Sequence, residues 1–333
     1  MKKRILKAFL AVIGFLVSIL VLVGYLSSST LPAEERTQTV FYQSMSQPQD
    51  SLLNVVTYNL GYLSGMTNNR SIVRERAFFD ENLRNAKALF AKREVDIVGF
   101  QEIDFASSRS FHRNQMDSLA QAGGFVAGYK SVNWDKRYVP FPYWPPSNHF
   151  GKMLSGQAIV ANTPLAKGQT ITLAPYKSAP AYYRAFYLDR LLQLAEVEFL
   201  GQKVMVMNLH LEAFDAETRV EQIKTLKEIY AQYASKQPVI LMGDFNSVVP
   251  AAGSEEDAIE QLMKSPWIRS AIPFDEHDKH STFPSEAPVK MIDYIFYNEN
   301  FLTCAHYEVI VEAGQISDHL PVAATLRLKA NTY

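Results

Sequence analysis

The longest apolar stretch of the chain runs without a charged residue from Ala8 to Leu26, directly after a basic segment at residues 1–7. At a rise of about 1.5 Å per residue it can cross a hydrocarbon layer of about 30 Å, and it is longer than the apolar core of most signal peptides. We expect a transmembrane signal anchor at residues 8–26. Because basic flanks stay inside, residues 1–7 are expected in the cytoplasm and the remaining chain outside the inner (plasma) membrane, as a single-pass protein. A form cleaved after the small residues "SSST" and secreted is the alternative.

A polar segment at residues 27–50 follows, and we expect it to be a linker. Residues 51–330 then alternate between apolar runs and amphipathic stretches without a low-complexity break, which predicts one globular domain. Strands are predicted at residues 52–58, 95–100, 156–162, 191–199, 203–209, 238–242, 291–298, 306–312 and 320–328, and helices at residues 80–93 and 215–234. Hairpin-like strand pairs outnumber the helices, so we expect an α/β protein with layers of mixed or antiparallel sheet.

Polar side chains gather where the predicted strands begin or end. A carboxylate beside buried apolar residues needs a hydrogen-bond partner, a metal ion or a proton. The polar residues at these strand ends are Asn59, Gln101, Glu102, Asn208, His210, Asp244, Asn246, Asp293, Asp318 and His319. If the strand ends meet at one edge of the fold, these side chains line a common cleft.

Composition narrows the classes of function. Of the 333 residues, 47% are hydrophobic, which supports a large core, and the formal net charge is −1. Proteins that bind nucleic acid by non-specific attraction usually carry a basic surface, so nucleic acid is not the favoured partner. Cys304 is the single cysteine, so it has no intrachain disulfide partner and a thiolate zinc site is excluded.

The residue types at the strand ends suit metal-assisted hydrolysis. Carboxylate and amide oxygens are the ligands that Mg²⁺ or Mn²⁺ prefers. His210 and His319 can serve as a general base and as a hydrogen-bond donor to a transition state. The chain has no GxSxG sequence, which disfavours a serine hydrolase. The combination favours attack of water on a phosphate ester.

A set of motifs follows in order along the chain, and together they resemble the endonuclease/exonuclease/phosphatase superfamily, which includes DNase-like nucleases, neutral sphingomyelinases and inositol-phosphate 5-phosphatases. The motifs are "TYNLG", "FQEID", "SGQAIVANTP", "NLHLE", "GDFNS", "STF", "MIDYIF" and "SDHLPV". The resemblance extends from about Leu52 to Leu328. It implies a four-layer α/β sandwich, in which two mixed β-sheets lie face to face with helices outside. It also implies a phosphoric ester hydrolase that depends on Mg²⁺, with Mn²⁺ as the alternative.

The resemblance implies a metal site and a water-activating pair. Glu102 matches the principal metal ligand, and Asn59 and Asp318 match ligands that bind directly or through water. His319 matches the imidazole that activates or orients water, with Asp293 as its carboxylate partner. A carboxylate on one imidazole nitrogen fixes the tautomer and raises the basicity of the other nitrogen.

The resemblance also implies contacts to the reacting phosphoryl group. His210 matches a donor to a non-bridging oxygen, Asp244 a group that positions the nucleophile, and Asn246 a hydrogen-bond donor to the phosphoryl oxygen as charge develops. Family members differ in which residue is the general base, so that assignment stays open.

Three further residues are weaker candidates for substrate binding. Thr282, in "STF", matches a family position near the site. Arg190 could reach a phosphate, although an ion pair with Asp189 or Glu196 explains it equally well. His149 could line the cleft, although a histidine in such a loop more often lies on the surface.

The family does not fix the substrate. We favour a phosphodiester in a phospholipid or sphingolipid headgroup, because the anchor keeps the domain near a bilayer and the aromatic segment at residues 134–146 suits the membrane–water interface. The alternatives are an extracytoplasmic endonuclease or exonuclease, an inositol-phosphate-type phosphomonoesterase, and a non-catalytic binding module on this fold. The segment "GDFNSV" lacks the arginine that inositol 5-phosphatases carry after GDxN, and the complete set of motif residues disfavours a module without activity.

Overall fold

The computed structural model describes the chain except residues 1, 44–50, 69, 71, 250–257 and 330–333. Residue 1, residues 44–50 of the expected linker and residues 69, 71, 250–257 and 330 of the expected domain therefore lie outside the described residues. The helices are α1 (Lys2–Ser27), α2 (Arg76–Lys92), α3 (Gln115–Gly123), α4 (Ala181–Phe186), α5 (Ala216–Ala234) and α6 (Ala258–Met263). The strands are β1 (Thr37–Phe41), β2 (Leu52–Asn59), β3 (Ile97–Asp104), β4 (Ala127–Val139), β5 (Gly151–Ala161), β6 (Leu165–Thr172), β7 (Leu191–Phe199), β8 (Gln202–His210), β9 (Val239–Asp244), β10 (Ile268–Ser270), β11 (Asp293–Asn298), β12 (Leu302–Val309) and β13 (Val322–Leu328).

The strands form two mixed sheets. The seven-stranded sheet has the order β1-β4-β5-β3-β2-β13-β12, and the six-stranded sheet has the order β10-β11-β9-β8-β7-β6. Each contains one parallel pair, β2 with β3 and β8 with β9, and the remaining named pairs are antiparallel. Both parallel pairs lie in the interior of their sheets, where strands are buried on both faces.

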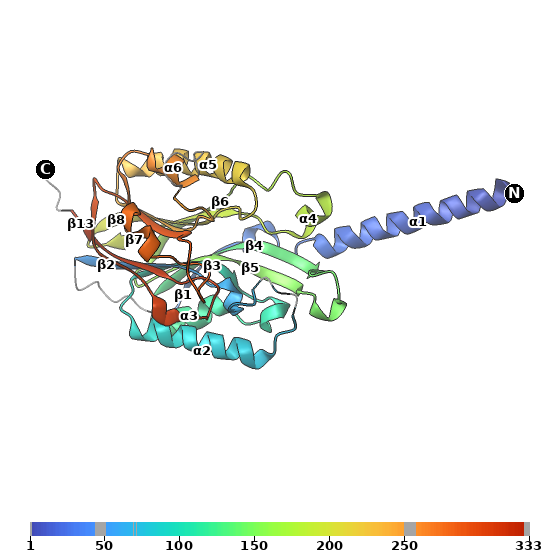
Figure 1. Ribbon diagram of the computed structural model, residues 1–333, viewed down its shortest axis with the longest axis horizontal. Coiled ribbons are helices and arrows are strands. Elements are labelled where there is room, and N and C mark those ends of the chain that lie inside the picture. Colours follow the sequence, from blue (N-terminus) through green and yellow to red (C-terminus); the bar gives the residue numbers. More distant parts are fainter. Residues whose placement is uncertain (1, 44–50, 69, 71, 250–257, 330–333) are drawn as a thin grey trace.

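The sheets pack face to face, with α2 and α3 covering the outer face of one and α5 and α6 covering the other (Figure 1). The predicted layered α/β fold with two mixed sheets is therefore confirmed. In α5 the buried positions Gln222, Leu226, Tyr230 and Ala234 recur every four residues, so one face of the helix packs on the sheet.

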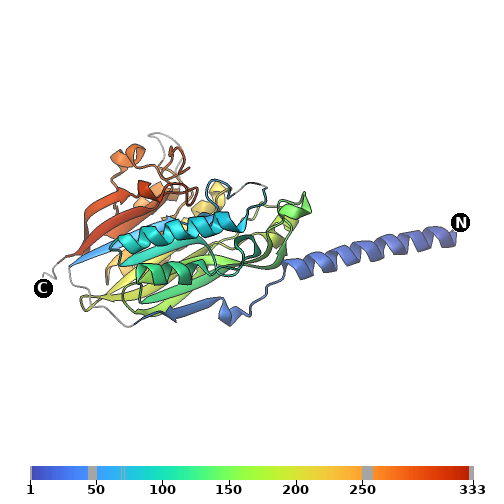
Figure 2. The ribbon, with the colours of Figure 1, turned by 90° about the horizontal axis from the view of Figure 1, so that it is seen from below.

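Helix α1 stands apart from the sandwich. It projects from one end of the domain as a single helix (Figures 1 and 2). It has 26 residues, a mean hydropathy of 2.7 and no buried residues in its most apolar stretch, so it is long and apolar enough to cross a membrane. A membrane anchor and a signal sequence both have these properties.

The segment expected to be a linker contains part of the sheet. Thr37–Phe41 forms β1, an edge strand that pairs antiparallel with β4. Leu31 and Val40 pack against the core between this sheet and its helices. A five-residue edge strand with an exposed polar face leaves almost no periodic pattern, so a tether was predicted where the structure has a strand.

Candidate active site

The site lies where the two parallel strand pairs end. Asn59 is the last residue of β2, and Glu102 lies near the end of the adjacent β3. In the other sheet, His210 and Asp244 end β8 and β9 and face each other in register. Parallel strands present their carboxyl ends at one edge, so the stacking of the two sheets brings both edges together.

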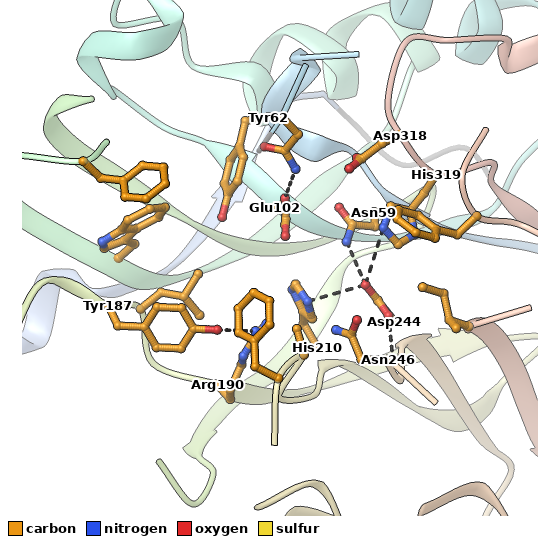
Figure 3. Close-up of a pocket in the computed structure, with 18 of the residues that line it drawn as sticks. Asn59, Tyr62, Glu102, Tyr187, Arg190, His210, Asp244, Asn246, Asp318 and His319 are labelled. Atoms are coloured by element: carbon orange, nitrogen blue, oxygen red, sulfur yellow. Dashed lines mark hydrogen bonds and ion pairs between the residues drawn. The ribbon is translucent and has the colours of Figure 1, made fainter. Parts of the chain in front are cut away.

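The antiparallel strands beside these pairs, β11 and β13, contribute site residues at or just before their first residues. Asp293 begins β11 directly opposite Asp244, and Asp318 and His319 come just before β13, which pairs with β2. Eight predicted residues line a cavity of about 780 Å³: Asn59, Glu102, Arg190, His210, Asp244, Asn246, Asp318 and His319. Those from the seven-stranded sheet face those from the six-stranded sheet across the cavity (Figure 3).

Asp244 occupies the centre of this group. Its Oδ2 accepts a hydrogen bond from Asn59 Nδ2 at 2.8 Å, and it lies 3.5 Å from His210 Nε2 and 3.8 Å from His319 Nε2. Burial, and then the negative charge of Asp293, raise the pKa of Asp244 to about 7. Asp244 is thus poised to hold or release a proton near neutral pH.

The loop after β9 fixes the direction of Asp244. Its Oδ1 accepts a hydrogen bond from the backbone N–H of Asn246 at 2.8 Å, which closes a tight turn. Asn246 has a φ of 47°, a conformation that asparagine tolerates well, and its Nδ2 donates to the carbonyl of Leu211. Gly243 is required before it, because a Cβ there would lie 2.1 Å from the carbonyl oxygen of Leu209.

His319 and Asp293 form the predicted pair. His319 Nδ1 lies 2.9 Å from Asp293 Oδ2, which also accepts a hydrogen bond from the Thr282 hydroxyl at 2.6 Å. Burial opposes a charge on the imidazole, but Asp293, followed by Asp244, raises the pKa of His319 well above its usual value. The ring of Phe283, with its centroid 4.9 Å from that of His319, supports the imidazole from the side.

His210 has the opposite electrostatic character. Burial lowers its pKa well below the usual value, and the charges of Arg190 and His319 lower it further. His210 is therefore a neutral imidazole at physiological pH. In this form it can donate a hydrogen bond from one ring nitrogen but carries no positive charge.

Glu102 is turned into the cavity by a local irregularity of β3. The pairing of β3 with β5 shifts register between Phe100 and Ile103, and Glu102 has a φ of 48°. Such bulges re-aim side chains beside active sites. Asn68 Nδ2 donates to Glu102 Oε2 at 2.8 Å, whereas burial and the negative charge of Asp318 raise the pKa of Glu102.

The carboxylates of Glu102 and Asp318 repel each other, and a cation bound between them would relieve this repulsion. Together with the amide oxygen of Asn59, these carboxylates form a set of hard oxygen ligands of the kind that Mg²⁺ prefers. A second buried group, Asp244, Asp293 and His319, has ligand atoms within 4.8 Å of one another and could also hold a metal ion. In that second group His319 bonds Asp293 Oδ2, but Asp293 Oδ1 is buried without a hydrogen-bond partner among the described residues, so both groups could accept a cation.

Gly61 lets the chain pass close to Asp318. Its φ is +51°, and a Cβ there would lie 2.7 Å from Asp318 Oδ1 and 2.8 Å from Ser317 Oγ. Gly124 provides a matched control, because it has a left-handed φ of +71° but a Cβ there would meet only the end of the Gln43 side chain, at 3.8 Å.

Gly61→Ala is expected to lower the free energy of unfolding by about 1–2 kcal/mol through backbone strain and to weaken Mg²⁺ dependence by displacing Asp318. Gly124→Ala is expected to show the loss of stability alone. Thermal unfolding and activity measured against Mg²⁺ concentration test both. Equal Mg²⁺ dependence in the two variants would contradict a role for Asp318 at the metal.

Arg190 lies in the cavity wall but forms neither of the expected ion pairs. Its Nε donates to Glu212 Oε2 at 3.3 Å and its Nη2 donates to the hydroxyl of Tyr187 at 2.7 Å. Its Nη1 is buried and has no hydrogen-bond partner among the described residues. Because that N–H is shielded from solvent, the guanidinium can act on an anion in the cavity through its positive charge and not through Nη1.

The other two weaker candidates lie outside the cavity wall. Thr282 bonds Asp293 and so supports the His319 pair from behind. His149 lies in the loop between β4 and β5, where its ring nitrogens contact the hydroxyl of Tyr138 and the carbonyl of Tyr143. Neither residue is placed to contact a substrate in the cavity.

An aromatic half of the cavity was not predicted as part of the site. It is lined by Tyr62, Trp134, Phe141, Tyr143, Phe150, Tyr183, Phe186, Tyr187 and Phe214. The guanidinium of Arg109 lies 3.3 Å from the centroid of the Tyr62 ring and pairs with the buried Asp104. The cavity therefore has a polar end with carboxylates and imidazoles and an apolar end with aromatic rings.

Two facing mixed sheets with carboxylate, amide and imidazole side chains at one edge are characteristic of metal-dependent phosphoesterases. A model of the Endonuclease/Exonuclease/phosphatase family matches residues 56–319. The chain belongs to this family. No curated protein matches it.

Solved structures with the same fold include three with different descriptions. An endonuclease/exonuclease/phosphatase from Bacteroides vulgatus is 18% identical, with a TM-score of 0.58, covering 84% of this chain and 99% of that one. A mannosyl-6-phosphatase from Bacteroides thetaiotaomicron is 17% identical, with a TM-score of 0.58, covering 82% and 99%. D. rerio TDP2 in complex with a single-strand DNA product is 18% identical, with a TM-score of 0.56, covering 84% and 100%. At these identities the likeness shows the fold alone.

Proposed function

We propose that this protein is a membrane-anchored, divalent-metal-dependent phosphodiesterase that hydrolyses the headgroup of a phospholipid or sphingolipid. The observation that carries the proposal is the two-ended cavity. Its polar end holds the residues for attack on a phosphate ester, and its aromatic end suits an apolar group attached to that ester. The apolar helix α1 would keep the domain beside a bilayer.

In this proposal Glu102 is the main ligand of Mg²⁺, with Asn59 and Asp318 completing the protein's share of the coordination. When bound, the ion supplies positive charge that polarises the phosphoryl group. Asn68 orients Glu102 by its hydrogen bond, and such outer partners tune metal sites. Mn²⁺ has the same ligand preference and is the alternative ion.

Water attack falls to the residues around Asp244. Asp244 orients the water and accepts its proton, since its pKa of about 7 suits a general base at neutral pH. His319, held by Asp293, keeps a proton 3.8 Å from Asp244 Oδ2 and orients the same water. His210 and Asn246 donate to the phosphoryl oxygens as negative charge develops, and the guanidinium of Arg190 adds positive charge at the cavity wall.

The orientation of the chain follows from its charges. Lys2, Lys3, Arg4 and Lys7 precede the apolar stretch and would stay in the cytoplasm, which places the catalytic domain on the outer side of the inner (plasma) membrane. Cleavage near the end of α1 would instead release a secreted form.

A substrate panel on the full chain in detergent and in vesicles tests the proposal. We expect Mg²⁺-dependent cleavage of sphingomyelin or a glycerophospholipid, and much slower cleavage of plasmid DNA, RNA, inositol phosphates and a sugar phosphate monoester. The DNA and monoester arms are included because neighbouring structures with this fold are a DNA complex and a mannosyl-6-phosphatase. Preferential cleavage of nucleic acid or of a monoester would replace the lipid proposal, and no activity in any arm would favour a binding module.

A further inference from the structure

The end of α1 is held firmly to the catalytic domain. The carboxylate of Asp135, in β4, accepts hydrogen bonds from the backbone N–H of Thr30 at 2.8 and 2.9 Å, from that of Leu31 at 2.9 Å and from the Thr30 hydroxyl at 2.6 Å. The backbone N–H of Arg137 donates to the carbonyl of Ser28 at 3.1 Å. Asp135 is 6% exposed, so these are largely water-excluded contacts. The chain is fixed within four residues of the end of the helix at Ser27.

The last turns of α1 also pack on the wall of the cavity. Val23 and Leu26 contact the aromatic cluster at the apolar end of the cavity, and the guanidinium of Arg137 lies 5.1 Å from the centroid of Tyr25. Five members of that cluster line the cavity itself: Tyr62, Trp134, Val139, Phe150 and Phe186. The side chains that α1 contacts also line the cavity. The orientation of α1 therefore fixes which way the cavity opens.

Exposed aromatic side chains surround the same end of the domain. We call Phe141, Tyr143 and Trp144 of the β4–β5 loop, with Tyr182 of α4, the aromatic rim; they are 37%, 49%, 77% and 62% exposed. The two segments meet through the rings of Tyr143 and Tyr182, with centroids 6.5 Å apart. Both segments lie at the end of the domain from which α1 leaves (Figure 1), and Phe141 and Tyr143 also line the cavity.

We propose that the aromatic rim inserts into the headgroup region of the same bilayer that α1 crosses, so that the cavity opens onto that membrane surface. The proposal rests on the membrane anchoring given under the proposed function. Tyrosine and tryptophan favour the membrane–water interface, and an exposed aromatic surface of this kind marks an interaction site. We call the hydrogen bonds of Asp135 to Thr30 and Leu31 the clamp. Because the clamp holds the aromatic rim at the level where α1 leaves the membrane, the bilayer is the partner that the rim would contact. A lipid would then enter by lateral movement from this leaflet, with its phosphate toward Glu102.

Tryptophan fluorescence of the full chain in phosphatidylcholine vesicles tests the insertion. The chain has three tryptophans, Trp134, Trp144 and Trp267. Lipids brominated near the glycerol end of the acyl chain are expected to quench the wild type, and Trp144→Phe is expected to lose most of that quenching. Trp267→Phe is the matched control, because Trp267 is 41% exposed but lies outside the rim, and it is expected to keep the quenching of the rim. Equal quenching in the wild type and in Trp144→Phe would overturn the proposal, as would a reduction confined to Trp267→Phe.

A flexible insertion tests the role of the clamp. About 12 Gly and Ser residues placed between Ser27 and Ser28 keep the anchor but free α1 from the domain, and they are expected to lower quenching of Trp144 severalfold. The same insertion at the exposed turn between Leu200 and Gly201 is expected to leave it unchanged. Unchanged quenching with the first insertion would show that the clamp does not position the rim.

The fluorescence readout needs no turnover, so it separates this proposal from the proposed lipid substrate. Quenching at Trp144 in a protein that does not cleave lipids would support insertion of the aromatic rim and contradict the proposed lipid substrate. Lipid cleavage without quenching would support the lipid substrate and contradict insertion of the aromatic rim. Binding of the rim to a protein in a vesicle-free sample, with no quenching in vesicles, would assign the surface to a protein partner and overturn the proposal.

Discussion

Replacing His319 with alanine is expected to lower kcat for phosphate-ester hydrolysis by about 10²–10⁴-fold, the usual contribution of a positioned acid or base. The imidazole lies between Asp293, at 2.9 Å, and Asp244, at 3.8 Å, so its removal leaves two buried carboxylates without the cation that separates them. The rate should be measured on a small soluble diester, so that membrane binding does not enter.

The matched control for this variant is His306→Ala, which removes an exposed histidine from β12. It is expected to keep the wild-type rate. Thermal unfolding of both variants shows whether the fold survives. A folded His319→Ala protein with a rate within about tenfold of the wild type would contradict its proposed role in orienting the attacking water beside Asp244.

Replacing Glu102 with glutamine is expected to abolish Mg²⁺-dependent activity and the stabilisation of the folded protein by Mg²⁺. A ligand bound at 100 times its dissociation constant adds about 2.7 kcal/mol to the free energy of unfolding. Loss of even an outer partner of a metal site typically lowers affinity by about 10–100-fold, and loss of the main ligand should cost at least as much. The shift of the melting temperature with Mg²⁺ measures binding independently of turnover.

This experiment also distinguishes the two possible metal groups. If the ion were held by Asp244, Asp293 and His319 instead, Glu102→Gln would keep its Mg²⁺-dependent shift. Glu198→Gln, an exposed carboxylate on β7, is the control and is expected to behave as the wild type. Treatment with EDTA should remove the activity of the wild type and of this control, and Mg²⁺ should restore it.

Much of the polar site could be predicted because it lies at the ends of apolar strands. Asn59, His210 and Asp244 each end a strand whose buried residues are evident in the sequence. The β-sheet geometry then places such ends together. The grouping of these side chains was therefore accessible from the order of the motifs, although the contacts among them required the structure.

The partners from irregular segments could not be predicted in this way. Tyr62 and Asn68 follow β2 in a loop where Tyr62 and Leu63 have positive φ, so no period identifies their direction. The pairing of Arg190 with Glu212 depends on the alignment of β7 with β8 and the loop beyond it. Contacts of this kind are set by tertiary packing, and sequence spacing does not encode them.

Strands with buried polar residues were missed for a related reason. β4 carries Asn133 and Asp135 among its inward positions, which breaks the apolar alternation expected of a strand. Asp135 is satisfied by distant backbone, the N–H groups of Thr30 and Leu31, whereas Asn133 Oδ1 is buried without a hydrogen-bond partner among the described residues. The partner that explains a buried Asp135 in β4 is therefore the segment around Thr30 and Leu31, which is distant in sequence and could not be identified from the pattern of β4 itself.

The position of β13 in the first sheet bears on how the protein is made. β13, the last strand, pairs with β2 on one side and β12 on the other, and it follows directly after His319. While the chain is still emerging from a ribosome or a translocation channel, β2 has an open edge, and Asn59 lacks the partners that arrive with the final strand. The first sheet therefore gains its pairing on this side of β2 only after β13 has emerged, and until then the open edge of β2 is exposed to aggregation.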